Sequence, residues 1–179
     1  VLLHTRAGAV NRIAELGRDA HADLAPGEVL VIEYQPKLDR AGNLAEASEE
    51  DVREAYLRAL SSSVARDTGA GMTTQGPHRD DITFTLDGLG AGGFASRAQQ
   101  RTIALSLRLA ETQLLRERRG ESPVLLLDDI LSEMDAARRQ SVLGALGVGE
   151  QMLVTGTDWD RFPAEFVAAA SLFEVESGA

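Results

Sequence analysis

The chain has 179 residues, 44% of them hydrophobic, so it can bury a sizeable core as one domain or as part of one. It has no cysteine, which excludes a disulfide framework and a thiolate metal site, and no apolar run approaches the roughly 20 residues of a membrane-spanning helix. The formal net charge of −10 argues against a surface that coats DNA generally, because duplex binding depends on neutralising phosphates. We therefore expect a cytoplasmic protein and, since the sequence begins with Val1 rather than Met, already inside what looks like a helix, a fragment of a longer one.

Any DNA contact must come from local basic clusters. The candidates are five arginines, Arg116, Arg118, Arg119, Arg138 and Arg139. Cations near a helix C-terminus are also favoured by the helix dipole, and that alternative is the better supported one.

The chain is expected to begin with a helix over residues 2–24, which Pro26 and Gly27 would end. The apolar residues that recur near one face of this helix are Leu3, Val10, Ile13, Leu16 and Leu24. His4 and His21 lie in the same segment without a cysteine or a cluster of carboxylates beside them. We expect both histidines at the surface rather than on a metal.

A strand and a second helix are expected next. Residues 29–34 have strand composition, and residues 35–47 form a polar loop. Ser48 begins the helix, with Asp51 three residues later as in a capping box. The helix is expected to end near Ala65.

Residues 68–71 predict a flexible connector to a turn-forming run at residues 76–81, Gly-Pro-His-Arg-Asp-Asp. His78 beside two aspartates suggests either a general base or metal ligand, or a hydrogen-bonded turn that fixes a junction. The structural alternative is favoured, and His78 is left out of the catalytic set. Residues 82–86 alternate as in a half-buried strand, and Asp87-Gly88 is a hairpin turn signal.

A long helix is expected from about Arg97 to Arg119, with Ser96 as its N-cap and Gly120 as its stop. Its apolar face contains Ile103, Leu107, Ala110 and Leu114. Glycines within residues 90–93 let the backbone approach a ligand closely. Because first-turn amides and the positive end of the dipole attract anions, the start of this helix is a candidate phosphate site.

Residues 124–127 are four apolar residues, which predicts a strand buried on both faces as in a parallel sheet. Asp128 and Asp129 follow at its carboxyl end, where open α/β sheets bind ligands. Asp128 is the natural ligand for a Mg²⁺ ion that bridges phosphate oxygens, and Asp129 could orient or deprotonate the attacking water. The alternative is that the two aspartates only cap the next turn.

Another short buried strand is expected over residues 151–155. Two successive strand–helix–strand units in a parallel layout would place its end beside the double aspartate. Thr155 and Thr157 could then sense the γ-phosphate of a nucleotide.

The remaining C-terminal signals are weaker. Asp135 is expected to cap a helix that runs to about Leu146. Trp159 and Phe162 are expected to pack a loop onto the core, and residues 172–175 suggest a last short strand.

A phosphate-binding P-loop is absent from this sequence. That motif requires a lysine after a glycine-rich loop, and Lys37, the only lysine, sits in Gln-Pro-Lys-Leu with no glycine before it. A helix start and an acidic strand without a P-loop cannot hold ATP alone.

Four runs resemble motifs of the RecF family of ABC-type head ATPases. The Ser-x-x-Gln-Gln-Arg-Thr run at residues 96–102 is similar to the signature motif, residues 125–129 to Walker B, and residues 132–135 to the D-loop. The run at residues 76–81 is also similar to one seen in this family. The resemblance covers roughly residues 70–160 well and the rest loosely.

The resemblance implies an α/β fold of the P-loop NTPase class, ABC-ATPase head type. This chain would be its C-terminal part, lacking the Walker A segment, with a small helical lobe. Residues 1–68 would belong to helical lobe II and a connecting strand, and residues 69–179 to the head.

The implied function is DNA repair, recombination and replication, including the SOS response. Two heads would dimerise with ATP on double-stranded DNA near single-strand gaps and hydrolyse ATP slowly, with RecO/RecR-type proteins as partners. This fragment alone is expected to be inactive.

The implied cofactors are ATP and Mg²⁺. Ser96 and its neighbours would grip the γ-phosphate held by the partner head, while Asp128 and Asp129 would act in their own head, Asp128 on the metal. The implied cofactor-binding residues are Ser96, Arg97, Ala98, Gln99, Asp135, Thr155 and Thr157. Family members usually have glycine at the place of Ala98 and commonly histidine where Gly156 or Thr157 stands, which puts close phosphate approach and a histidine sensor in doubt.

Two alternatives remain open. One is a non-catalytic dimerisation or partner-docking module that keeps the ATPase fold. The other is a P-loop ATPase with a different signature.

Overall fold

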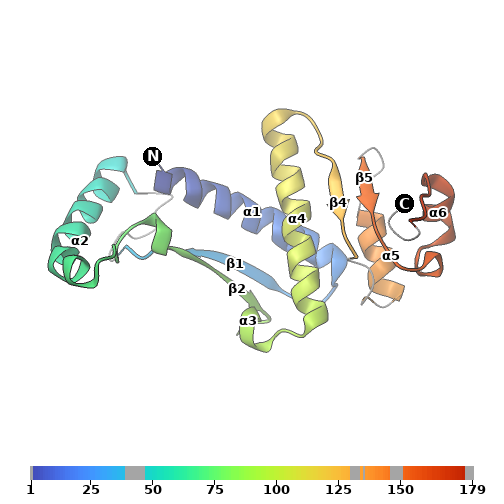
Figure 1. The fold of residues 1–179 in the computed structure, drawn as a ribbon, viewed down its shortest axis with the longest axis horizontal. Helices are drawn as coiled ribbons and strands as arrows, with labels where there is room; N and C mark the ends of the chain where they lie inside the picture. The colour runs from blue at the N-terminus through green and yellow to red at the C-terminus, as the bar shows by residue number, and fades with distance from the viewer. Residues whose placement is uncertain (1, 39–46, 130–133, 135, 146–150, 176–179) are drawn as a thin grey trace.

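The computed structural model describes residues 2–38, 47–129, 134, 136–145 and 151–175 (Figure 1). Two long helices, α1 (Leu2–Leu24) and α4 (Arg97–Arg119), pack against each other at the centre of the molecule. Arg12 of α1 donates two hydrogen bonds to Glu117 of α4, at 2.7 and 3.1 Å. These bonds hold the pKa of Glu117 below its usual value. The predicted bounds of both helices are confirmed.

The first sheet is antiparallel, in the order β1 (Leu30–Gln35), β2 (Asp81–Leu86), β3 (Leu89–Gly90). Asp87 and Gly88 connect β2 to β3 with φ of +50° and +79°, the left-handed values that a tight two-residue hairpin needs, as predicted. The side chains that form the core against this sheet are Leu30, Ile32, Leu86, Ala91 and Ile103. Since Ala91 lies in the short helix α3 (Ala91–Phe94), this core supports the start of α4.

The second sheet is a parallel pair, β4 (Leu125–Leu127) and β5 (Met152–Val154), with α5 (Ala136–Ala145) between them in sequence. Its core contains Leu24, Leu105, Leu125, Leu127, Met134, Val142 and Leu143. The prediction that β4 is buried on both faces was wrong, because Leu126 is 70% exposed. Successive strand side chains point to opposite faces, and in the described part of the chain only one face of this pair is covered. Leu153 of β5, which pairs with Leu126, is exposed for the same reason.

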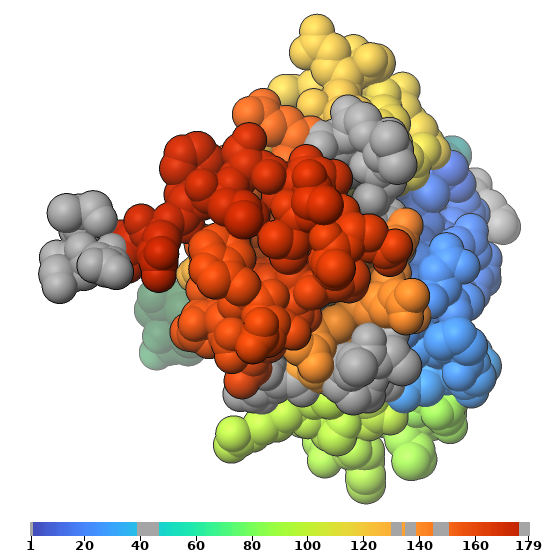
Figure 2. Space-filling model, turned by 90° about the vertical axis from the view of Figure 1, so that its right-hand side faces the viewer, coloured from blue at the N-terminus to red at the C-terminus, as the bar shows by residue number. Residues whose placement is uncertain are grey.

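The C-terminal segment covers one end of the molecule, which Figure 2 views directly. Phe162 stacks on Phe166 of α6 (Ala164–Ala169) with ring centroids 5.8 Å apart, so its predicted packing is confirmed. Trp159, in the 3₁₀ turn η2 (Trp159–Arg161), is instead 45% exposed. Residues 172–175 form no strand and are exposed, so that prediction was wrong.

The second helix, α2 (Glu49–Ala70), is longer than predicted. Ser48 caps it by accepting from the Asp51 N–H, as expected, but the helix continues through the supposed connector and ends at Gly71, whose φ is +64°. Side chains pack it against α1 through a small core: Leu3, Ala7, Leu38, Val52 and Ala55.

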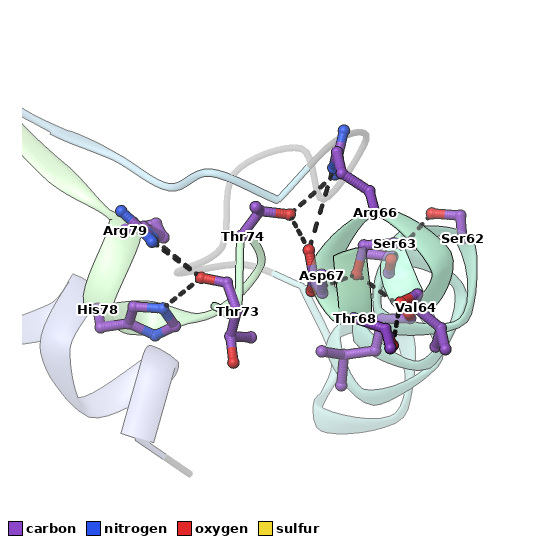
Figure 3. A network of polar contacts seen from close by, with 12 residues as sticks. Ser62, Ser63, Val64, Arg66, Asp67, Thr68, Thr73, Thr74, His78 and Arg79 are labelled. Carbon is purple, nitrogen blue, oxygen red and sulfur yellow. Dashed lines mark hydrogen bonds and ion pairs between the residues drawn. The ribbon is translucent and has the colours of Figure 1, made fainter. Parts of the chain in front are cut away.

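Polar contacts tie the end of α2 to the following turn (Figure 3). Asp67 accepts hydrogen bonds from Thr74 and Ser63, and the Thr74 hydroxyl is the main reason that the pKa of Asp67 is lowered. His78 and Arg79 of η1 (Pro77–Arg79) both contact the carbonyl oxygen of Thr73. The run at 76–81 therefore forms a hydrogen-bonded turn, in agreement with the structural interpretation of His78.

Packing continues across the expected boundary between residues 68 and 69. Strand β1 pairs with β2 along its whole length, and α1 packs on α4. Asp80 adds to this connection, since it accepts hydrogen bonds from the Tyr34 hydroxyl and the Lys37 N–H, the latter at 2.9 Å. The two-part division of the chain stays a prediction.

Candidate functional site

Residues 96–99, here called the helix mouth, form a complete capping box at the start of α4. The Ser96 hydroxyl oxygen accepts from the Gln99 N–H at 3.2 Å, and the Gln99 side-chain oxygen accepts from the Ser96 N–H at 2.9 Å. The first four amides of a helix have no partner within it, and this arrangement satisfies two donors reciprocally. At the other end, Gly120 stops the helix with a left-handed φ of +72°.

The chemistry of the helix mouth fits a phosphate. Ser96 and Arg97 are exposed, and Ala98 and Gln99 are half-buried. The N–H groups of Arg97 and Ala98 are first-turn donors that no carbonyl of the helix accepts. The Ser96 oxygen accepts within the capping box, so its hydroxyl hydrogen can still be donated. These donors, the positive end of the dipole and the Arg97 guanidinium all favour an anion.

Two residues that the sequence analysis did not assign to the site, Glu28 and His21, lie behind the helix mouth. Glu28 accepts a hydrogen bond from the Gln99 side-chain NH₂ at 3.3 Å. His21 is fully buried, and its ring contacts Glu28 at 3.3 Å and Ser106 at 3.1 Å. The prediction that His21 lies at the surface was wrong because its position falls on the buried stripe of α1, between Gly17 and Leu24. His4 is half-buried, with its ring against the Ala47 carbonyl oxygen.

The second candidate element, here called the strand tip, comprises Asp128, Asp129 and Thr155. The Thr155 hydroxyl donates to Asp128 Oδ1 at 2.6 Å and accepts from the Asp129 N–H at 3.0 Å. The Thr155 N–H in turn donates to the Leu127 carbonyl at 3.0 Å, which continues the parallel pairing of β4 and β5. The predicted proximity of Thr155 to the double aspartate is therefore a feature of the structure.

Asp129 adopts a left-handed backbone conformation with φ of +48°. Outside glycine this conformation is uncommon, although aspartate and asparagine tolerate it best. Both Asp128 and Asp129 are exposed at the end of β4. Their carboxylates can therefore be reached from solvent.

A shallow pocket opens beside the strand tip. Its lining residues are Asp129, Thr155, Gly156, Thr157, Asp158, Arg161 and Phe162. The ring of Phe162 lies so near Gly156 that a Cβ there would meet it at 3.1 Å, which explains the small residue at this position. Thr157 thus shares a pocket with Asp129, as the sequence suggested, whereas Asp135 lies outside the described residues.

Within the part of the chain that the structure describes, no group of three or more histidine, cysteine, aspartate or glutamate side chains could hold a metal ion. Magnesium is commonly held by one or two carboxylates together with water and substrate phosphates. The exposed Asp128 carboxylate, oriented by Thr155, fits that mode.

In Figure 1, β4 runs downward and α4 runs upward, so the strand tip and the helix mouth each lie at the lower end of their own element.

The candidate DNA-contacting arginines have partial structural explanations. Arg116 donates to Ser122 at 2.8 Å, and Arg118 and Arg119 are exposed at the end of α4. Arg139 donates to the Arg161 carbonyl at 3.1 Å. No described helix is long and apolar enough to cross a membrane.

No family model matches the chain, but individual relatives do. It is 40% identical over 179 residues to the DNA replication and repair protein RecF of Chloroflexus aurantiacus, an alignment that covers 99% of this chain and 45% of the relative. The RecF of Gloeobacter violaceus is 33% identical over 178 residues, covering 99% of this chain and 46% of the relative. The chain is related to RecF. It spans about 45% of the length of the curated relatives that it matches.

Solved structures agree. The recombination mediator protein RecF, as RecF-ATPrS in the RecFOR pathway, superposes with a TM-score of 0.72 at 31% identity, covering 89% of this chain and 42% of that one. The corresponding RecF-ATP structure has the same TM-score at 34% identity, with 86% and 40% coverage. The expected fold class, α/β of ABC-ATPase head type, is confirmed. The roles of individual RecF-like site residues stay predictions.

Proposed function

We propose that this chain is the signature and Walker B portion of a RecF-like ATPase that acts in DNA replication, repair and recombination. ATP would be sandwiched between two heads, with the helix mouth of one head facing the P-loop of the other. The observation that carries this proposal is the exposed, fully formed capping box at Ser96, whose remaining donors suit a phosphate. The RecF-ATP neighbour supports the choice of nucleotide, and the RecF relatives support a role in DNA replication and repair.

At the helix mouth, the Ser96 hydroxyl and the N–H groups of Arg97 and Ala98 would donate to the γ-phosphate of the nucleotide on the partner head. Gln99 would hold Ser96 in place through the capping box. Ala98 stands where the family usually has glycine, and Arg97 can offset a less close approach by pairing with phosphate directly.

At the strand tip, Asp128 would hold Mg²⁺ and Asp129 would orient or accept a proton from the attacking water in the same head. The metal, when bound with ATP, would neutralise charge on the phosphate oxygens. Thr155 keeps the Asp128 carboxylate and the Asp129 backbone in a fixed relation, and Thr157 reaches the same pocket. Asp135 is proposed to contribute from the D-loop.

We further propose that the whole protein dimerises with ATP on double-stranded DNA at junctions with single strands, hydrolyses ATP slowly and works with RecO/RecR-type partners in the cytoplasm. The RecFOR pathway of the structural neighbours supports these partners. Because the net charge is −10, we expect the DNA contacts to be local.

The test uses the full-length protein that carries this segment, with Ser96→Arg at the helix mouth. The variant should bind ATP but fail to dimerise, because the long side chain fills the space of the partner's γ-phosphate. Ser61→Arg on the exposed surface of α2 serves as the control and should dimerise normally. ATP-dependent dimers that survive Ser96→Arg, measured by sedimentation, would overturn the proposal.

A further inference from the structure

A chain of hydrogen bonds runs from the helix mouth into the core between α1 and α4. Gln99 donates to Glu28 Oε1 at 3.3 Å, Glu28 Oε2 lies 3.3 Å from His21 Nε2, and His21 Nδ1 lies 3.1 Å from the Ser106 hydroxyl. His21 and Ser106 are both fully buried, and the Glu28 side chain is only 19% exposed. Buried polar groups of this kind are costly unless each has its partner, so the chain of contacts constrains every member.

The hydrogen-bond directions can be assigned from the inner end outward. Ser106 donates its hydroxyl to the Thr102 carbonyl at 2.8 Å, so its oxygen must accept from His21 Nδ1. His21 Nε2 contacts Glu28 Oε2 at 3.3 Å, so Glu28 uses one carboxylate oxygen for His21 and keeps the other for Gln99.

This arrangement fixes which way the Gln99 amide points. Its NH₂ is held by Glu28 on one side, so its oxygen is turned toward the Ser96 N–H on the other. A capping box needs that oxygen in that position. Gln99 thus links Glu28 and His21 to Ser96, the N-cap of α4.

We propose that Glu28 and His21 are positioning residues for the helix mouth, holding Gln99, and through it Ser96, in the geometry that grips phosphate on the partner head. This inference rests on the function proposed above, and it adds two residues from outside the signature segment. The same helix pair contains a matched control in Arg12–Glu117, which also joins α1 to α4 but lies about 27 Å further along α4.

The experiment compares Glu28→Ala, Glu28→Gln and Glu117→Ala in the full-length protein. Glu28→Ala removes the carboxylate that holds the Gln99 amide and contacts His21, so ATP-dependent dimerisation should weaken about tenfold. Glu28→Gln should restore it to within about twofold, because the carboxamide can donate to His21 Nε2 and accept from Gln99. Glu117→Ala should leave dimerisation unchanged although it breaks an ion pair between the same helices.

A second readout does not depend on nucleotide. Hydrogen exchange of the peptide spanning residues 95–101 should quicken several-fold in Glu28→Ala and stay at the wild-type rate in Glu28→Gln and Glu117→Ala. Equal effects of Glu28→Ala and Glu117→Ala would overturn the inference, as would failure of Glu28→Gln to restore both readouts. If Ser96→Arg abolishes dimers while Glu28→Ala changes neither readout, only this inference fails; if Ser96→Arg leaves dimers intact, the proposed function fails first.

Discussion

The helix mouth and the strand tip are built in different ways. The helix mouth stands on a 23-residue helix, has a complete capping box, and is backed by the buried His21 of α1 and the half-buried Glu28 of the loop before β1. The strand tip ends a three-residue strand in a two-stranded sheet whose other face exposes Leu126 and Leu153. Thr155 is the side chain that binds both of its aspartates. Among the described residues, polar side chains from α1 and the loop before β1 stand behind the helix mouth, whereas the strand tip lies at the edge of the apolar core and is bound by the Thr155 hydroxyl.

The largest expected effect comes from removing the proposed base at the strand tip. Asp129→Asn in the full-length protein should lower the rate of ATP hydrolysis about 1,000-fold while ATP still binds, because a neutral amide cannot accept the proton of water. Single-turnover hydrolysis measures the loss. Asp160→Asn, in the nearby exposed turn η2, is the control, and equal loss in both variants would contradict the assignment.

The core beneath both elements gives the next largest effect, this time on stability. Leu105→Ala should reduce the free energy of unfolding by about 3 kcal/mol, because Leu105 is fully buried between α4 and β4. Leu126→Ala, a substitution in the exposed face of β4, should cost less than about 0.5 kcal/mol. Denaturant unfolding measures both, and similar losses would mean that the open face of β4 is covered.

A smaller effect is expected for the local support of the strand tip. Thr155→Val removes the hydroxyl that binds Asp128 and Asp129, and it should slow hydrolysis about tenfold, since one charge-assisted hydrogen bond is lost. Thr155→Ser keeps the hydroxyl and should retain most of the rate. A Val variant as fast as wild type would show that Thr155 does not position the aspartates.

The smallest expected effect is on the pH dependence of stability, through Tyr34 of β1. Burial, then the hydrogen bond to Asp80, raises the pKa of Tyr34 to about 12. Because folding favours the protonated phenol, its contribution to stability is complete below pH 10 and is lost as the pH rises toward 12. Ring carbon NMR, assigned with Tyr34→Phe, should record this titration, and Asp80→Asn should lower the pKa. Ionisation near the ordinary value of 10 in the wild type would be the contrary result.

Local signals predicted much of the helix mouth and of the fold. Ser96 and Gly120 marked the bounds of α4 because capping chemistry acts within a few residues, and Asp87-Gly88 marked the hairpin for the same reason. The adjacency of Thr155 to the double aspartate followed from the handedness of parallel strand connections.

Other features depended on tertiary contacts that no local pattern contains. The burial of His21 arises because α1 packs on α4, although its place on the same helical stripe as Leu24 was a usable signal. No local sequence signal pointed to Glu28, because the fold alone brings it to Gln99 and His21. The exposure of Leu126 was missed because a run of four apolar residues does not state how many layers cover the sheet.

The most direct test of the two-headed site is a mixed dimer. In a purified heterodimer of one Ser96→Arg head and one Asp129→Asn head, an arrangement in which the helix mouth serves the partner's nucleotide leaves one site intact. We therefore expect about half the wild-type hydrolysis per dimer, and almost none when wild type is paired with the double variant. The opposite result, with the first dimer inactive and the second half-active, would mean that the helix mouth and the strand tip serve the same head's nucleotide, and would contradict the account.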